Sequence, residues 1–369
     1  MLFRSGLNSN NIWGSITDKE GNIWIGTRGS GINKLFKKCC TVINETYGLI
    51  EGNIRSLFVD SKDNLWIGGL SNSISRLRNN TVQNYSSKNG FDGTNIRSIT
   101  EDRHGNIWIG SYLGLYKFDG KKFSLSEYND YFSEKSVICL KYIDEKLFVL
   151  LRDNTLFIFN DDGTYKKYNS NEMGFEVELV SIETFRNLDD IFIIGNDGIS
   201  IYKNDLFKQY ISNKEINHSS IYCFYIDRNQ TIWIGSKNSG LFYKEKDKKW
   251  EVLTKDQNLP SNSILDIIED DYGDIWISTS NGVCKIGSDG IISLDVNDGI
   301  AGNSNIESVC YNRKIYFCST NGISVINPKN IYKNFIVPNT VITSIKGINA
   351  LNYDSEITLD YYENNFTFY

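Results

Sequence analysis

Apolar and polar positions follow one pattern that returns at regular intervals along this chain. Residues 21–27 read GNIWIGT, a short apolar stretch between polar turns. The pattern returns with its tryptophan at residues 63–69, 105–111, 230–236 and 273–279. Weaker copies without tryptophan occur at residues 146–150, 190–195 and 314–320. The eight copies lie about 42 residues apart on average, so the chain is built from one repeated unit.

Each repeat predicts four short β-strands. Residues 54–60 alternate apolar and polar side chains before an aspartate, as expected of a first strand. The turn at residues 102–106 contains Gly105, which accepts the positive φ of a tight turn, and the apolar strand follows. Residues 114–118 give a third strand and residues 121–124 a weaker fourth. Four strands in a period of about 40–45 residues indicate an all-β fold, the β-propeller.

The strand that carries the tryptophan is apolar on both faces. Ile23, Trp24 and Ile25 follow one another with no polar residue between them. An open antiparallel sheet has one polar face, whereas a propeller blade packs against a neighbour on each side. We therefore expect the repeated tryptophans to fill the space between blades rather than to stack on sugars. These residues are Trp24, Trp66, Trp108, Trp233 and Trp276.

The number of blades depends on how the first and last repeats combine. The eighth repeat has a third strand at residues 322–326 but no clear fourth strand before Pro328. Residues 1–5 align with the end of a fourth strand, and we expect them to complete the last blade and close the ring. This favours about eight four-stranded blades. Seven blades and one stray repeat are the alternative, which would leave an apolar sheet face exposed.

The repeat stops near residue 330, and a different alternation follows. Val341, Thr343 and Ile345 alternate with other residues, and similar short stretches occur near Leu359 and Phe366. We assign residues 1–330 to the propeller, and residues 331–369 to a linker and the first strands of a C-terminal β-sandwich. The chain ends before such a sandwich could close, so we expect it to be a fragment of a longer protein.

Composition and charge narrow the classes of function. Aromatic residues make up 13% of the 369 residues, which favours strands. The net charge of −6 argues against a nucleic-acid partner, which needs a basic surface. No stretch approaches the roughly 18 apolar residues that span a membrane. Residues 1–6 lack the apolar stretch of a signal peptide. Membrane attachment is therefore expected only through segments outside this chain.

The sequence gives little sign of a metal or a cofactor. Its two histidines, His104 and His218, are too few for a site built on several histidines. Its seven cysteines form no C-x-x-C pair, and we expect most of them to be small apolar residues in strands. Asp18, Asp60 and Asp270 lack the spacing of a calcium loop and are expected to cap turns. We expect no metal, no cofactor and no catalytic residue.

One repeat pattern resembles that of a known family. The repeat is best seen at residues 95–115 and 11–32 and is close to N-x-I-x-S-I-x-x-D-x-x-G-N-I-W-I-G-T-x-x-G-L, which resembles the repeat of the two-component regulator propeller family. The resemblance covers roughly residues 1–330. The tail from Asn339 resembles the start of the three-tyrosine domain that follows these propellers. Family propellers often come in tandem with seven blades each, so a count of eight departs from the family.

The resemblance implies the extracytoplasmic sensor domain of a bacterial membrane receptor. In such receptors the three-tyrosine domain leads to a transmembrane helix and to a cytoplasmic histidine kinase or diguanylate cyclase. Many members of the family sense oligosaccharides. The implied partners are an oligosaccharide or another small ligand, the rest of the receptor chain, and a second copy of the chain in a homodimer.

A ligand is expected on the face where two kinds of loop emerge. In a four-stranded blade the fourth-to-first and second-to-third connections share one face, where a central pocket forms. Arginine forks there would bind carboxylates or sulfates, and aromatic rings would contact the faces of sugars. The predicted ligand-binding residues of these loops are Trp13, Arg28, Arg55, Arg97, Tyr112, Arg152 and Lys237.

Two other functions stay open at this stage. The repeats also resemble those of propeller lyases of the streptogramin lyase type, which would need a general base and a carboxylate on the ligand face. His218 and Glu178 fall on that face, whereas His104 falls on the opposite one. The third function is a scaffold that binds a protein through one propeller face, which would favour a broad apolar patch.

Overall fold

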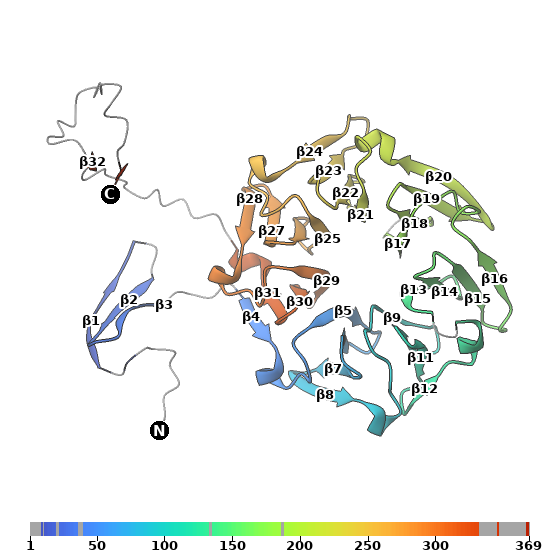
Figure 1. Ribbon diagram of the computed structural model, residues 1–369, viewed down its shortest axis with the longest axis horizontal. Coiled ribbons are helices and arrows are strands. Elements are labelled where there is room, and N and C mark those ends of the chain that lie inside the picture. The colour runs from blue at the N-terminus through green and yellow to red at the C-terminus, as the bar shows by residue number, and fades with distance from the viewer. Residues whose placement is uncertain are drawn as a thin grey trace. The chain divides into compact units, whose positions relative to one another are not determined.

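The computed structural model describes residues 9, 11–19, 22–35, 40–132, 135–185, 188–331, 345–346 and 367–368. The chain divides into two compact units. One unit comprises Lys38–Lys333, and the other comprises Met1–Lys37 and Asn334–Tyr369. The larger unit is a ring of seven four-stranded antiparallel sheets (Figure 1). The all-β propeller predicted from the repeats is therefore confirmed.

The first three blades occupy one side of the ring. The first blade contains β5 (Ile54–Val59), β6 (Leu65–Gly69), β7 (Ile74–Arg78) and β8 (Thr81–Tyr85). The second contains β9 (Ser98–Glu101), β10 (Ile107–Ser111), β11 (Gly114–Phe118) and β12 (Phe123–Leu125). The third contains β13 (Val137–Ile143), β14 (Lys146–Leu151), β15 (Leu156–Asn160) and β16 (Tyr165–Tyr168).

Four further blades complete the ring. The fourth contains β17 (Leu179–Glu183), β18 (Ile191–Gly195), β19 (Gly198–Lys203) and β20 (Leu206–Ser212). The fifth contains β21 (Ile221–Ile226), β22 (Ile232–Ser236), β23 (Leu241–Lys244) and β24 (Glu251–Leu253). The sixth contains β25 (Ile264–Glu269), β26 (Ile275–Thr279), β27 (Gly282–Gly287) and β28 (Gly290–Leu294). The seventh contains β29 (Asn305–Tyr311), β30 (Lys314–Ser319), β31 (Gly322–Ile326) and β4 (Cys40–Ile43).

The helices of the described residues are short 3-10 turns. They are η1 (Glu45–Tyr47), η2 (Ser87–Asn89), η3 (Glu127–Tyr131), η4 (Asn213–Ile216), η5 (Lys255–Gln257), η6 (Val296–Asp298) and η7 (Pro328–Asn330). The Asn44 side chain caps η1 by accepting a hydrogen bond from the N–H of Thr46, and Gly48 ends it with a φ of 110°. The described part of the chain contains no helix that is long and apolar enough to cross a membrane.

The core of the ring lies between the blades. Each of seven clusters of buried apolar side chains joins one blade to the next. Trp66 in the first blade packs on Phe118 in the second, with 5.4 Å between the ring centroids. Trp108, Trp233 and Trp276 are likewise buried. The prediction that these tryptophans fill the space between blades is confirmed within the ring.

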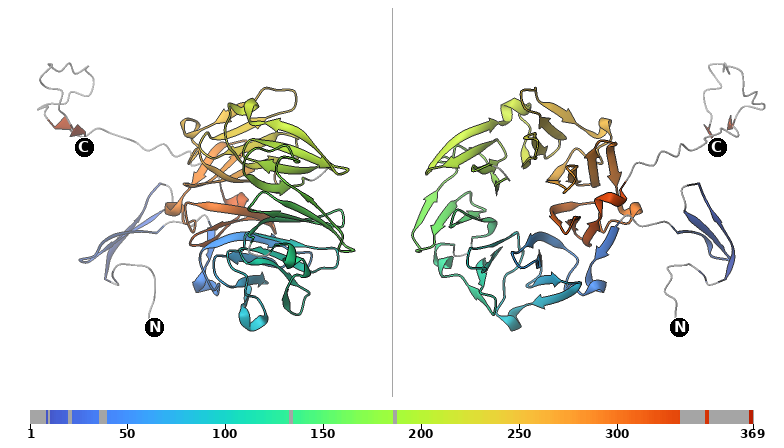
Figure 2. Two further views of the ribbon diagram at one scale, coloured as in Figure 1. Left: turned by 45° about the vertical axis from the view of Figure 1, so that its right-hand side comes forward. Right: turned by 180° about the vertical axis from the view of Figure 1, so that it is seen from behind.

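The ring closes through a strand that precedes the first blade. β4 pairs with β31, so that Ile43 faces Ile323 and Cys40 faces Ile326 (Figure 1). Ile43 is buried in the apolar cluster that joins the seventh blade to the first. Viewed from behind, the blades keep the same neighbours and run round the ring in the opposite sense (Figure 2). A strand from before the first blade therefore closes the ring by completing the seventh blade, as the missing fourth strand of the last repeat suggested.

This closure corrects the strand and the blade number favoured by the sequence. The closing strand is Cys40–Ile43, whereas residues 1–5 lie outside the described residues. Because β4 is the fourth strand of the first repeat, that repeat cannot add a four-stranded blade to the ring. The ring unit accordingly begins at Lys38 rather than residue 1 and has seven blades, the alternative considered above.

The first repeat forms a three-stranded sheet in the smaller unit. It contains β1 (Ile12–Thr17), β2 (Ile23–Thr27) and β3 (Gly31–Leu35). Ile16 is 70% exposed and Ile32 is 71% exposed. An exposed apolar sheet face is what the sequence predicted for a repeat that stands outside the ring.

Two short strands are described near the C-terminus. β32 (Ile345–Lys346) pairs antiparallel with β33 (Thr367–Phe368). Val341, Thr343, Leu359 and Phe366 lie outside the described residues. The three-tyrosine domain therefore remains a prediction.

Candidate functional site

Two kinds of loop meet at one end of the strands of the ring. In most blades a residue of the second-to-third turn donates its backbone N–H to a carbonyl just before the first strand. The pairs are Leu70 with Asn53, Tyr112 with Thr94, Arg152 with Ser136, Asn196 with Glu178, Lys237 with Ser220, and Ser280 with Ser263. The two kinds of loop therefore share one face, as the sequence predicted, and we call it the arginine face.

Adjacent blades are also joined at the arginine face. The N–H groups of Asn95 and Ile96, which precede the second blade, donate to Leu70 and Gly69 of the first. The hydroxyl of Thr94 donates to the same Leu70 carbonyl at 2.8 Å. These bonds fix the loop that carries Arg97, so its side chain starts from a rigid backbone.

Arg97 lies among charged and aromatic groups from four other blades. Burial lowers the pKa of Arg97, and the positive charges of Arg55 and Arg152 lower it further. Tyr222 and Glu178 act in the opposite direction. Arg55 is the second residue of β5, Arg97 precedes β9, Arg152 follows β14, Glu178 precedes β17 and Tyr222 lies in β21. Consecutive blades thus bring three predicted ligand-binding residues together, and the sequence also placed Glu178 on this face.

Several polar atoms of this face have no hydrogen-bond partner among the described residues. The Nε atoms of Arg55 and Arg97 are buried and unpaired, although both side chains are only half-buried. The buried side-chain oxygens of Asn53, Asn95 and Ser136, which precede the first strands of three consecutive blades, are unpaired as well. Donors and acceptors are therefore both available to a polar ligand at this end of the first strands.

The remaining ring residues predicted to bind ligand lie at the rim of this face. Tyr112 is 51% exposed, in the turn between β10 and β11. Lys237 and Arg152 are exposed in the corresponding turns of the fifth and third blades. Tyr222 adds a second aromatic ring and is 38% exposed.

Two predicted site residues belong to the other unit. Trp13 lies in β1 and is 78% exposed, and Arg28 lies in the turn between β2 and β3. The guanidinium of Arg28 lies over the Trp13 ring, 5.9 Å from its centroid. They were assigned to the ring because the first repeat was counted as a blade. Residues 1–37 fall outside the ring unit, so the structure does not group these two with Arg55 and Arg97.

The residues required by the lyase alternative do not form a visible catalytic pair. His218 is exposed just after η4 and has a φ of 57°. Glu178 is exposed before β17 and faces Arg97. No hydrogen bond or ion pair among the described residues joins the His218 side chain to a carboxylate that could orient it.

The opposite face is built on aspartates that hold turns and tryptophans. The carboxylate of Asp60 accepts hydrogen bonds from the N–H groups of Lys62 and Asn64, both at 2.9 Å, and from Trp66 Nε1 at 2.8 Å. Asp102, Asp227 and Asp270 hold the equivalent tryptophans in the same way. The turn-capping role predicted for Asp60 and Asp270 is confirmed. We call this the aspartate face.

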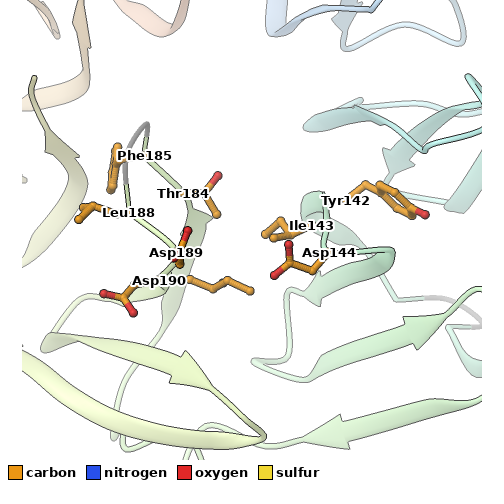
Figure 3. Close-up of a pocket in the computed structure, with 9 residues that line it drawn as sticks. Tyr142, Ile143, Asp144, Thr184, Phe185, Leu188, Asp189 and Asp190 are labelled. Atoms are coloured by element: carbon orange, nitrogen blue, oxygen red, sulfur yellow. The ribbon is translucent and has the colours of Figure 1, made fainter.

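A pocket of about 370 Å³ opens at the aspartate face between the third and fourth blades (Figure 3). Asp144, Asp189 and Asp190 line it, together with Phe185 and Leu188. This pocket lies at the opposite end of the strands from Arg152 and Glu178. Among the described residues, no group of His, Cys, Asp and Glu has the arrangement of a metal site.

The sequence was also compared with known families. The family described as two component regulator propeller matches residues 6–29, 48–71, 90–113, 215–238 and 258–281. The chain carries two-component regulator propeller repeats. These regulator repeats include each aspartate–tryptophan pair of the aspartate face. They also include Arg55, Arg97, Tyr112 and Lys237, whereas Arg152 and Glu178 lie in repeats that the family does not match.

Solved structures share the fold of these regulator repeats. The extracellular domain of the putative hybrid two-component system BT3049 of B. thetaiotaomicron is 22% identical, with a TM-score of 0.74. The match covers 95% of this chain and 50% of that one, so this chain spans about half of its length. A comparison with curated protein sequences gives no match.

Propellers with other roles share the fold at lower identity. A streptogramin B lyase is 12% identical, with a TM-score of 0.60, over 79% of this chain and 96% of that one. YCF48 bound to D1 peptide is also 12% identical, with a TM-score of 0.61, over 82% and 99%. At these identities the likeness concerns the fold alone.

Proposed function

We propose that the ring Lys38–Lys333 is the ligand-binding sensor domain of a bacterial membrane signalling receptor, on the extracytoplasmic side of the membrane. The regulator repeats and the shared fold with the extracellular domain of BT3049 support this role. In this proposal the rest of the receptor chain is the partner that carries the signal, and receptor chains act in pairs.

The ligand in this proposal is an oligosaccharide bound at the arginine face. The observation that carries the proposal is the convergence of Arg55, Arg97 and Arg152 from three consecutive blades beside Tyr222. Guanidinium groups and amides bind sugar hydroxyls and acidic groups, and aromatic rings pack on sugar faces. Residues of different blades would contact one ligand, so binding would bridge blades.

The signal would arise because the ligand binds one arrangement of the receptor more tightly than the other. A ligand shifts a receptor between two arrangements only by as much as it prefers one of them. Because the arginine face is fixed by hydrogen bonds between blades, we expect the ring to move as one body. The change would therefore occur where the ring meets other parts of the receptor.

Thermal unfolding of the chain with a panel of neutral and acidic oligosaccharides tests this function. A ligand at about 100 times its Kd stabilises the folded state by about 2.7 kcal/mol, which is readily detected. The proposal predicts stabilisation by one class of glycan, and recovery of that glycan unchanged after overnight incubation. Consumption of the glycan would contradict a sensor and support a lyase. A panel without effect would contradict oligosaccharide binding by this ring.

A further inference from the structure

We propose that the ligand of the arginine face carries an anionic group, a carboxylate or a sulfate ester, and that this group binds between the guanidinium groups of Arg55, Arg97 and Arg152. The inference rests on the proposed function, since it names the chemistry of the ligand that the sensor binds.

Among the described residues, the three guanidinium groups form no ion pair with a carboxylate, whereas those of Arg103 and Arg228 do. Arg103 pairs with Asp161 at 2.6 Å, and Arg228 pairs with Glu269 at 2.5 Å. Among the described residues, no ion pair joins Arg55, Arg97 or Arg152 to an acidic side chain. The folded ring therefore keeps three like charges close together, and none of them is neutralised by a direct ion pair.

Such a cluster costs free energy unless an anion offsets it. The charges of Arg55 and Arg152 both oppose the charge of Arg97, and partial burial adds to the cost. Glu178 also faces Arg97, but one carboxylate against three guanidinium groups leaves a net positive charge. A neutral sugar would leave this repulsion in place, whereas an anionic group would relieve it.

The geometry also suits a group with several oxygen atoms. Arg55 and Arg97 occupy the same position in consecutive repeats, 42 residues apart, so their side chains leave adjacent first strands at the same level. Their Nε donors are buried and unpaired. Arginine donates from Nε and the terminal nitrogens in a planar fork that matches carboxylate and sulfate oxygens.

The pocket of the aspartate face is a poor site for an anion. It lies between the third and fourth blades and is lined by Asp144, Asp189 and Asp190, which Figure 3 shows on two neighbouring loops. These carboxylates would repel an acidic ligand.

Inorganic sulfate is the simplest probe of this inference. The melting temperature of the whole chain is measured in sodium sulfate and in sodium chloride at equal ionic strength, for wild type, Arg97→Gln and Arg97→Lys. Arg78→Gln serves as the matched control, because Arg78 is exposed in β7, away from the arginine face. Non-specific stabilisation by sulfate rises linearly with concentration in every variant, whereas site binding adds a stabilisation that begins near the Kd and above it grows only with the logarithm of concentration.

We expect this additional, logarithmic stabilisation by sulfate in wild type and in Arg78→Gln. The apparent affinity should fall about tenfold or more in Arg97→Gln, and by less in Arg97→Lys, which keeps the charge but not the fork. Equal logarithmic stabilisation in wild type and Arg97→Gln, or none in wild type, would overturn the inference. If Arg97→Gln does not fold, Arg152→Gln takes its place, because Arg152 is exposed.

Three glycans separate this inference from the proposed function. Chitobiose is neutral, a hyaluronan tetrasaccharide carries carboxylates, and a chondroitin sulfate tetrasaccharide adds sulfate esters. If an acidic glycan binds to wild type and binds more weakly to Arg97→Gln, the result supports both the inference and the proposed function. Chitobiose binding that is equal in wild type and Arg97→Gln keeps the proposed function and overturns the inference. Sulfate binding without binding of any glycan keeps the inference and contradicts oligosaccharide sensing.

Discussion

The carboxylate of Asp266 on β25 accepts two hydrogen bonds from Ser308 on the next blade. The donors are the backbone N–H at 2.7 Å and the hydroxyl at 2.6 Å. Burial raises the pKa of Asp266 to about 7, and the nearby charge of Glu183 adds to the rise, while the bonds from Ser308 oppose it. Glu307 and Cys223 also interact with it. An acid on an innermost strand therefore holds a proton near neutral pH.

This relationship predicts that stability falls as the pH rises. In the unfolded chain Asp266 ionises near its ordinary pKa of 3.8, whereas in the ring it ionises near 7. Between these values the folded state binds more protons than the unfolded state, so the free energy of unfolding decreases with increasing pH. The loss through this group is complete above about pH 7.

Asp266→Asn isolates the contribution of this group. We expect its free energy of unfolding, measured by urea denaturation from pH 4 to pH 8, to fall less steeply with pH than that of wild type. Asp63→Asn, an exposed change with the same loss of charge, should follow the wild-type slope. Parallel curves for wild type and Asp266→Asn would show that Asp266 ionises normally.

The bond between Asp60 and Trp66 predicts a large local effect of losing the carboxylate. Asp60→Ala leaves the buried indole N–H and two turn N–H groups without their acceptor. We expect a loss of about 1–3 kcal/mol in the free energy of unfolding of the ring. Asp18→Ala removes the equivalent bond to Trp24 in the other unit and should leave the ring transition in calorimetry unchanged. An Asp60→Ala ring as stable as wild type would refute this role.

The pairing of β4 with β31 predicts where the chain can be shortened. Removal of residues 1–37 should leave the melting temperature of the ring unchanged, because the ring unit begins at Lys38. Removal of residues 1–44 also deletes β4 and buried Ile43, and leaves the edge of β31 unpaired. We expect the melting temperature to fall by roughly 10 °C, or folding to fail. Equal melting of the two truncated chains would contradict closure by β4.

The repeat spacing was sufficient to predict the ring but not its closure. The strands containing Trp66, Phe148 and Tyr316 are each the second strand of a blade, as their spacing predicted. The closing strand could not be chosen by spacing, because residues 1–5 and Cys40–Ile43 both correspond to fourth strands of consecutive repeats. The choice depends on which repeats form the closed ring, and that is a property of the packing between blades.

Part of the candidate site could also be inferred in advance. Arg55 and Arg97 occupy the same repeat position, and turn geometry does not require arginine there, so the sequence singled them out. Trp13 was misplaced with its repeat. The six-residue spacing from Asp60 to Trp66, repeated in five repeats, was visible in the sequence, but its hydrogen bond was not predicted.

The sequence analysis did not predict the contacts that polar residues of the innermost strands make between blades. Lys141 and Glu183 form an ion pair of 2.8 Å between the third and fourth blades, and Asp266 bonds to Ser308 between the sixth and seventh. The available signal was a charged or hydroxyl-bearing residue at matching positions of apolar first strands, 42 residues apart in each pair. Their pairing depends on which blades are neighbours, so the repeat alone did not reveal it.

Hydrogen exchange with and without the most stabilising acidic glycan tests the central claim most directly. The account predicts slower exchange in residues 51–55, 93–97 and 218–222 of the arginine face. Exchange in the turns of the aspartate face, residues 60–64, 102–106 and 227–231, should be unchanged. Protection confined to those turns, or to residues 11–35 of the other unit, would contradict a ligand site at the arginine face.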